Sequence, residues 1–389
     1  MSRPKGQLAK PIFAKIAPHE YLVANLARET TADSSPFGSG TRPNGRSPEE
    51  ARAFDVHTGS LSQAHGSAAV RLDRTRVICG VRAEILPVDN IPHYRPSAVT
   101  TAPTEAGSVF SQAEIDTDNR RQLRDYDLLV PNLELATGSA PEFLPGGPPS
   151  VLAQPLSTRL YSLLHASGLV DAERLKIWHQ PPSSRSTDSK SGDDEMDVDE
   201  SDADEALDAF DPGQATQGPE LKAYWTLYID LLFLSFDGNP FDAAWAAVVA
   251  ALRDTQLPLA RWDADRGEVV CSPQTETESE PETNVASSAP LTLRGLPVAT
   301  TAVVCVENKK KRQQGGARWI LLDPDRLEEN QCRETVTVVV DRSDGSQTMV
   351  RALSKTGGVL VGPRELHALV AAAEKRWTAL AEALDSAKP

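Results

Sequence analysis

The residues best suited to chemistry are carboxylates at two turns of the chain. Paired carboxylates can work as general acid and general base. Carboxylates beside turns also cap helices and form turns, and at single positions this structural role is the commoner one. We therefore expect mainly structural roles for these residues, which are Asp237, Asp242, Asp323, Asp325, Glu328 and Glu329.

Other chemical motifs are missing from the sequence. There is no G-x-S-x-G nucleophile motif, and the seven histidines are isolated. The sequence contains no H-E-x-x-H motif and no cluster of Cys and His, which are the patterns that would suggest a metal site. The glycine-rich motifs that bind nucleotide phosphates, G-x-x-x-x-G-K-[ST] and G-x-G-x-x-G, are also absent from the sequence. We expect neither a metal nor a cofactor.

Basic residues could contact phosphates in two places. The first is a turn with basic flanks, RPNGR at 42–46, followed by Arg52. The second is the cluster Lys309–Arg312, which lies in the loop of a predicted hairpin. For this cluster, a solvated hairpin tip or a nuclear-import patch is the better interpretation.

Two acidic stretches carry the whole net charge of the chain, which has 389 residues, a net charge of −15 and a pI near 5.0. Residues 188–211 hold twelve acids and one lysine, and residues 272–289 hold four glutamates and no base. Both are rich in Ser, Thr and Pro and cannot bury enough apolar surface to fold, so they are predicted disordered insertions. They are solvated linkers or, alternatively, an acidic tether that repels non-target RNA or binds a basic partner.

The compartment follows from what the sequence lacks. We expect no transmembrane helix, because no apolar run approaches about 20 residues, and no signal peptide. The four cysteines are scattered without any C-x-x-C. A disulfide framework and a zinc ribbon are both disfavoured, and a reducing compartment is the simple interpretation.

Periodicity predicts strands and helices in an order that occurs twice along the chain. The expected helices are one or two within 8–28, then 149–168, 240–255 and a helix from 362 onward. The expected strands are 54–84 in several pieces, 127–135, a strand starting at 175, 224–236, 300–307, 317–323, 335–341 and 348–354. Residues 87–122 are predicted to be a loop and 323–330 a turn. This order predicts an α+β fold with two related halves.

The helix at 240–255 has the strongest local signals. Asn239 can cap it, Pro240 suits its first position, and Asp242 lies in its first turn. The helix is apolar nearly all round, so it should be buried.

Four segments together resemble RNase PH-like proteins. They are RPNGR at 42–46, GSLSQAHGSAAVRLDRTRVICGVRAE at 59–84, FLSFDGNPFDAAWAAVVAALRDTQLP at 233–258 and DPDRLEEN at 323–330. The D-G-N and D-P-x-x-x-E-E forms are similar to the non-catalytic ring subunits of the eukaryotic RNA exosome. The resemblance implies the RNase PH-like fold (ribosomal protein S5 domain 2-like), with a β-α-β-β-α unit repeated twice.

We divide the chain into four regions on this basis. Residues 1–41 are an N-terminal extension with short helices, and residues 42–260 are a first RNase PH-like domain with a disordered acidic insertion at about 180–219. Residues 261–290 are an acidic linker. Residues 291–389 are a second such domain with a C-terminal helix.

The resemblance also implies a function. The chain would be a structural subunit in a hetero-hexameric ring of RNase PH-like subunits, capped by S1/KH subunits, that threads RNA to a separate hydrolytic exoribonuclease. Such a ring supports rRNA maturation, RNA turnover and surveillance in the nucleus, the nucleolus and the cytoplasm, with no membrane partner. Two alternatives are an active phosphate-dependent 3′-to-5′ exoribonuclease and a free-standing RNA-binding protein, for which a neutral body offers little electrostatic support.

Departures from the catalytic relatives argue against the enzyme. Where those relatives have a small-residue loop ending in Arg that grips phosphate, this chain has Asn239, Pro240 and Phe241. Where they place an Asp as general acid, six residues after the first Asp of the turn, this chain has Asp323 followed by Glu329. Proline offers no N–H, phenylalanine offers no charge, and the longer Glu side chain would misplace the proton. We expect no catalytic residue.

Three arginines are the candidate RNA contacts. They are Arg42, Arg46 and Arg159. Arg159 lies close to positions where some relatives carry RNA-binding arginines, here occupied by Thr158, Ser162 and His165.

Overall fold

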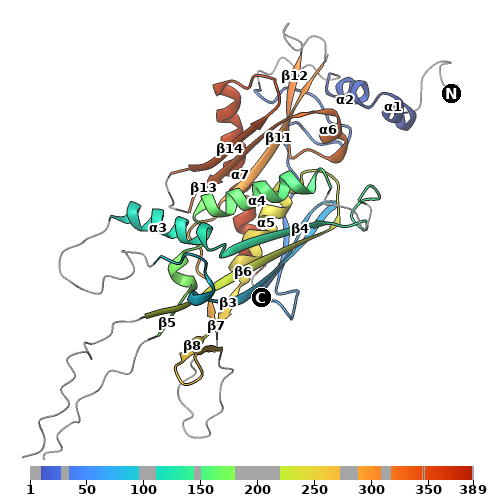
Figure 1. Ribbon diagram of the computed structural model, residues 1–389. Coiled ribbons are helices and arrows are strands. Elements are labelled where there is room, and N and C mark those ends of the chain that lie inside the picture. Colours follow the sequence, from blue (N-terminus) through green and yellow to red (C-terminus); the bar gives the residue numbers. More distant parts are fainter. Residues whose placement is uncertain are drawn as a thin grey trace, which may run out of the picture.

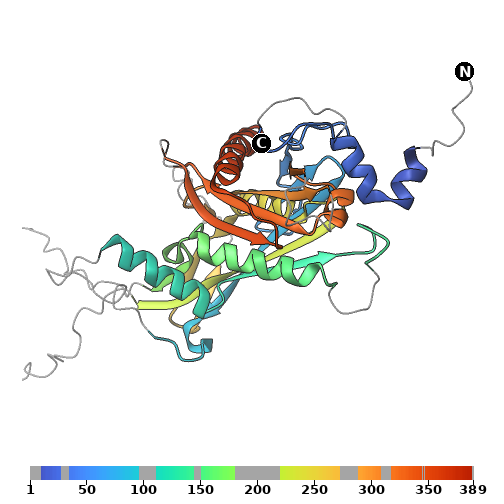
Figure 2. The same ribbon diagram turned by 90° about the horizontal axis from the view of Figure 1, so that it is seen from above.

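The computed structural model describes residues 10–27, 35–95, 111–143, 150–179, 220–271, 288–307, 317–343, 345 and 347–387 (Figure 1). Two larger β-sheets form the body, with helices between and outside them (Figures 1 and 2). In this part of the chain, no helix has the length and apolar character needed to cross a membrane.

The first sheet has six strands in the order β1-β2-β3-β6-β4, with β5 also paired to β6. Strand β4 runs parallel to β6, and the other pairs are antiparallel. These strands confirm the ones expected within 54–84, at 127–135, from 175 and at 224–236. Their bounds are β1 Asp55–Thr58, β2 Gly66–Leu72, β3 Thr75–Pro87, β4 Leu129–Leu135, β5 Lys176–His179 and β6 Glu220–Ser235.

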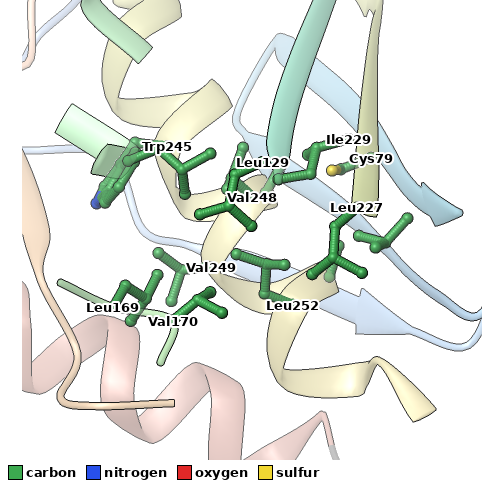
Figure 3. Packing of buried hydrophobic residues seen from close by; sticks show 14 of the residues in the cluster. Cys79, Leu129, Leu169, Val170, Leu227, Ile229, Trp245, Val248, Val249 and Leu252 are labelled. Carbon is green, nitrogen blue, oxygen red and sulfur yellow. The ribbon is translucent and has the colours of Figure 1, made fainter. Parts of the chain in front are cut away.

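Helix α5 (Pro240–Asp254) is the centre of the core. It packs against β2 and β3 of the first sheet and against β11 (Val298–Val306) of the second. Every residue from Pro240 to Leu252 is buried, as its all-round apolar sequence predicts. Its side chains Val248 and Leu252 lie toward Leu129 and Leu227 of the first sheet, and Val249 lies toward Leu169 and Val170 (Figure 3).

The second sheet has the strand order β12-β11-β13-β14, with all pairs antiparallel. The long helix α7 (Pro363–Ser386) packs against β11 and β13. With α4 (Ala153–Ser167) and α6 (Arg326–Gln331), the chain runs through β4-α4-β5-β6-α5 and then β12-α6-β13-β14-α7. A β-α-β-β-α order is therefore present twice. The remaining strands of the second sheet are β12 Arg318–Leu322, β13 Glu334–Asp341 and β14 Met349–Thr356.

Smaller elements complete the described chain. The one or two short helices expected within 8–28 are two, α1 and α2, and Leu22 and Leu26 of α2 are buried against the second sheet. The bounds are α1 Lys10–Ile16, α2 Pro18–Leu26, α3 Gln112–Asp125, two 3₁₀ turns at Val88–Asn90 and Ala172–Leu175, β7 Gln256–Pro258, β8 Ala260–Asp263, β9 Glu268–Cys271 and β10 Ser288–Pro290.

Two sequence-based expectations are wrong. The loop expected at 87–122 ends in α3, whose start is capped reciprocally by Ser111 and Glu114. This helix escapes periodicity because Ala113, Ile115 and Leu123 are its only apolar residues. The turn expected at 323–330 contains α6, which has the same kind of capping box between Asp325 and Glu328.

The region expected to be an acidic linker, 261–290, contains structure at both of its ends. Strands β8 and β9 form a hairpin, and β10 pairs with β7. Residues 272–287 of this region, the insertion at 180–219 and the Lys309–Arg312 cluster lie outside the described residues.

Candidate functional site

The two carboxylate-bearing turns of the sequence meet where β12 ends and α5 begins. Asp323 follows β12 with a backbone φ of 50°, and Asn239 precedes α5 with a φ of 51°. Gly238, beside Asn239, lies so close to the other turn that a Cβ would stand 2.4 Å from the carbonyl carbon of Asp325. A side chain larger than that of glycine would force the two turns apart.

Asp323 is fully buried and accepts hydrogen bonds from both sides. Arg52 donates to it three times, from its backbone N–H (2.7 Å), Nε (2.9 Å) and Nη2 (2.8 Å). The amide of Asn239 donates at 2.6 Å, and Arg46 lies 3.3 Å away. Asp323 therefore joins the segment before β1 to the start of α5 and the end of β12.

The surroundings of Asp323 keep it ionised. Burial alone would raise its pKa, but Arg376, Arg52 and Asn239 together lower the pKa well below its usual range. Arg376 comes from α7, is 5% exposed, and holds its Nη2 4.0 Å from Asp323. It also donates to the backbone carbonyl of Arg52 at 3.0 Å.

Asp242 is a second buried carboxylate, one turn into α5. It accepts the backbone N–H (2.9 Å) and the hydroxyl (2.7 Å) of Thr301 on β11. The side-chain amide of Asn239 donates to Asp242 at 2.8 Å as well as to Asp323, so it bridges the two carboxylates. Burial raises the pKa of Asp242.

These contacts correct the local roles expected from the sequence. Asn239 stands at the capping position, but its side chain makes no cap hydrogen bond and instead joins Asp242 to Asp323. Asp242 and Asp323 are buried links between distant segments rather than caps or turn formers. Asp325 does cap α6, as expected.

The side chain of Glu329, which belongs to α6, lies against the N-terminus of α5. Its carboxyl Oε1 accepts the backbone N–H of Asn239 at 2.8 Å, and the next residue, Pro240, has no N–H to offer. Burial is the main cause that raises the pKa of Glu329 to about 8. At neutral pH this carboxyl is therefore largely protonated, and it fills the place where an anion would meet the helix.

Of the three candidate arginines, Arg42 lies deepest. It is 2% exposed, donates to the carbonyls of Pro48, Leu322 and Asp323, and pairs with Glu328 at 3.4 Å. These partners give Arg42 a structural position rather than a surface one. The side chain of Arg46 is 14% exposed.

Arg159 lies in a cleft of about 860 Å³ in front of α5. Its guanidinium stacks over Phe241, 4.0 Å from the ring centre, and donates to Thr337 at 2.9 Å. Asn239, Pro240 and Glu329 also line this cleft. The structure thus brings four of the five departure positions and Arg159 to one cleft, with Asp323 behind it.

Sequence analysis missed two members of the site, Arg376 and Thr301. Arg376 had a usable signal, because it lies within the apolar stripe of α7 between Ala373 and Leu380, where a charged residue needs a buried partner. Thr301 had none, since it is one threonine in a β-rich strand. No cluster of metal-binding side chains occurs among the described residues.

A family model, the 3′ exoribonuclease family, domain 1, matches residues 50–258, which run from just before β1 to the end of β7. The chain is 29% identical over 262 residues to the exosome complex component rrp43 of Schizosaccharomyces pombe, and the alignment covers 67% of this chain and 66% of that protein. The sequence VICGVRAE at 77–84 likewise resembles ribosomal RNA-processing protein forty-three. The exosome complex component Rrp42 of Methanothermobacter thermautotrophicus is 26% identical over 355 residues, 91% of this chain and 93% of that one.

Two solved structures have the same fold. One is an Archaeoglobus fulgidus exosome with RNA bound to the active site, with a TM-score of 0.54, 21% identity, and 95% of this chain and 98% of that chain covered. The other is an archaeal exosome core, with a TM-score of 0.53, 20% identity, and 98% and 100% covered. At these identities the likeness shows the α+β RNase PH-like fold alone. The family match spans more than half of the sequence, and the chain therefore belongs to the 3′ exoribonuclease family of RNase PH-like proteins.

Proposed function

We propose that this chain is a non-catalytic structural subunit of an RNA exosome ring. It occupies one place among six RNase PH-like subunits, with S1/KH subunits as the cap and a hydrolytic exoribonuclease as the catalytic partner. The ring guides RNA to that nuclease, and the chain thereby supports 3′-to-5′ RNA processing and degradation, including rRNA maturation and surveillance. Its similarity to proteins named exosome complex components supports this place.

The contact between Glu329 and Asn239 carries the non-catalytic part of the proposal. A phosphate at the start of α5 would need the N–H that Glu329 already accepts at 2.8 Å. It would also have to displace a carboxyl group and approach Pro240, which has no N–H to donate, and Phe241, whose side chain carries no charge. The ionised carboxylate nearby, Asp323, is held by Arg52 and Asn239 behind the cleft and has no proton to give.

The remaining parts of the proposal concern RNA and location. Arg46 and Arg159 keep some exposure and are our candidates for RNA contact within the ring. Residence in the nucleus, the nucleolus and the cytoplasm follows from the proposed complex. The basic cluster Lys309–Arg312 is the sequence feature that fits nuclear import.

A phosphorolysis assay tests the proposal. The pure full-length chain is incubated with 5′-labelled single-stranded RNA and Mg²⁺, with and without inorganic phosphate, beside a phosphorolytic member of the family as positive control. We expect no phosphate-dependent shortening by the wild type or by Glu329→Asp, because Pro240 and Phe241 remain in both. Release of nucleoside diphosphates by the wild type would establish the alternative, an active phosphate-dependent exoribonuclease.

A further inference from the structure

Two of the four cysteines lie together beneath helix α2. Cys305 on β11 is 1% exposed, and Cys332, just after α6, is 4% exposed. Both belong to one buried cluster with Leu22, Leu26 and Trp319. Cys79 lies in the core of the first sheet and Cys271 at the end of β9, so neither shares this cluster.

The two cysteines lie on neighbouring segments of the second sheet. Cys305 is on β11, and Cys332 lies just before β13, which pairs with β11. They share one buried cluster, and the thiol of Cys305 is a neighbour that raises the pKa of Cys332. This proximity is what a disulfide requires, provided that the sulfur atoms close the remaining gap.

The cleft in front of α5 gives one of these thiols a route to small molecules. Cys332 lines the cleft of about 860 Å³, whereas Cys305 lies behind it, opposite Trp319 on β12. The contact with Cys305, burial, and the neighbouring carboxylates Glu328 and Glu334 all raise the pKa of Cys332. Because the thiolate is the reactive form, oxidation at this site is slow and needs sustained exposure to an oxidant.

We propose that Cys305 and Cys332 are a reversible modification site at which a hydroperoxide converts two thiols into one disulfide. The sulfur of Cys332 attacks one peroxide oxygen and the O–O bond breaks, so the first water leaves and Cys332 becomes a sulfenic acid. The sulfur of Cys305 then attacks the sulfur of Cys332, the S–O bond breaks, and the second water carries away the thiol proton. Two thiols lose two electrons, and one hydrogen peroxide becomes two waters.

The disulfide would fasten the end of α6 to β11. Helix α6 carries Glu328, which pairs with Arg42, and Glu329, which holds the start of α5. Oxidation would therefore lock the contact between the second sheet and α5, and a thiol reductant would release it.

Peptide mapping after oxidation tests the proposal. The full-length chain is treated with hydrogen peroxide, alkylated and digested without reductant. We expect a peptide that links Cys305 to Cys332 and disappears with dithiothreitol. Cys79→Ala and Cys271→Ala are matched controls that should keep the link.

The single variants separate the two steps. In Cys305→Ala, dimedone should trap the sulfenic acid on Cys332, because the resolving thiol is gone. In the wild type, oxidation should raise the Tm, and it should not do so in Cys332→Ala. Four free thiols after prolonged oxidation, a link through Cys79 or Cys271, or over-oxidised Cys332 without a link would overturn the proposal.

Discussion

The two sides of the start of α5 carry similar residues in opposite states. Behind it, Asp323 is ionised, accepts hydrogen bonds from Arg52 and Asn239, and has a pKa held well below its usual range. In front of it, Glu329 accepts one backbone N–H and has a pKa near 8. Six positions separate these carboxyl groups in the sequence.

Their surroundings decide which of them keeps its charge. Asp323 is matched by guanidinium groups from the segment before β1 and from α7. Glu329 faces a cleft without an ion-pair partner among the described residues. The back of the site therefore joins the two halves of the chain, whereas at the front the carboxyl group of Glu329 occupies the backbone N–H of Asn239 at the start of α5.

The largest expected effect comes from breaking the back of the site. Asp323→Asn keeps the shape of the side chain but leaves Arg52 buried without its counter-charge and leaves Arg376 with Asp242 as its remaining carboxylate partner. We expect a loss of about 3–5 kcal/mol in the free energy of unfolding, measured by urea denaturation. Asp325→Asn is the matched control, because asparagine caps helices as well as aspartate does. Equal losses in the two variants would contradict the claim that Asp323 joins the two halves of the chain.

Replacing the buried Arg42 should cost more stability than replacing Arg159 in the cleft. Arg42→Met removes donors from buried carbonyls and leaves Glu328 unpaired, so we expect it to cost about 2–4 kcal/mol. Arg159→Met loses one hydrogen bond and a stacking contact at the half-buried cleft, and should cost about 1 kcal/mol or less. Urea denaturation of both variants measures the difference. A larger loss for Arg159→Met would contradict the claim that the buried contacts of Arg42 and Asp323, rather than those in the cleft, hold the two halves together.

The pH dependence of stability should sharpen the comparison. Glu329 keeps its proton up to about pH 8 in the folded chain but loses it above about 4.5 when unfolded, so it makes the wild type lose stability as pH rises between these values. Glu329→Gln lacks this contribution and should exceed the wild type by about 1–3 kcal/mol at pH 8, with no such gain at pH 4. Asp323 acts with the opposite sign, since its stabilisation is present above pH 3.8 and is lost as pH falls below that value. Parallel pH profiles for wild type and variant, from urea denaturation, would show that Glu329 is not the proton-binding group.

The smallest effect is expected from the acidic insertions. Their sequences predict no core of their own, so limited proteolysis should cut 180–219 and 272–287 first. Replacing both by short Gly-Ser linkers should change the free energy of unfolding by about 0.5 kcal/mol or less. Failure of this deletion variant to assemble with partner subunits would give the insertions a structural role.

Periodicity and local signals were enough for much of the fold. Helix α5, β6 and the second sheet were predictable because their apolar residues follow helical or strand spacing over long stretches. The polar helix α3 and the short α6 were not, since their stability comes from caps and from neighbours distant in sequence.

The site was predictable as residues but not as an arrangement. Motifs singled out Asn239, Asp323 and Glu329, yet their opposite protonation depends on Arg52, Arg376 and burial. These arise only when α7, β12 and α5 come together. Arg42 shows the same limit, because a basic residue at a turn looks exposed in sequence and is buried in the structure.

Native affinity purification of the full-length chain, followed by mass spectrometry of its partners, tests the central claim most directly. We expect stoichiometric recovery of several RNase PH-like subunits, their S1/KH caps and a nuclease. Recovery of the chain alone, or as a homo-oligomer, would contradict the proposed place in a ring.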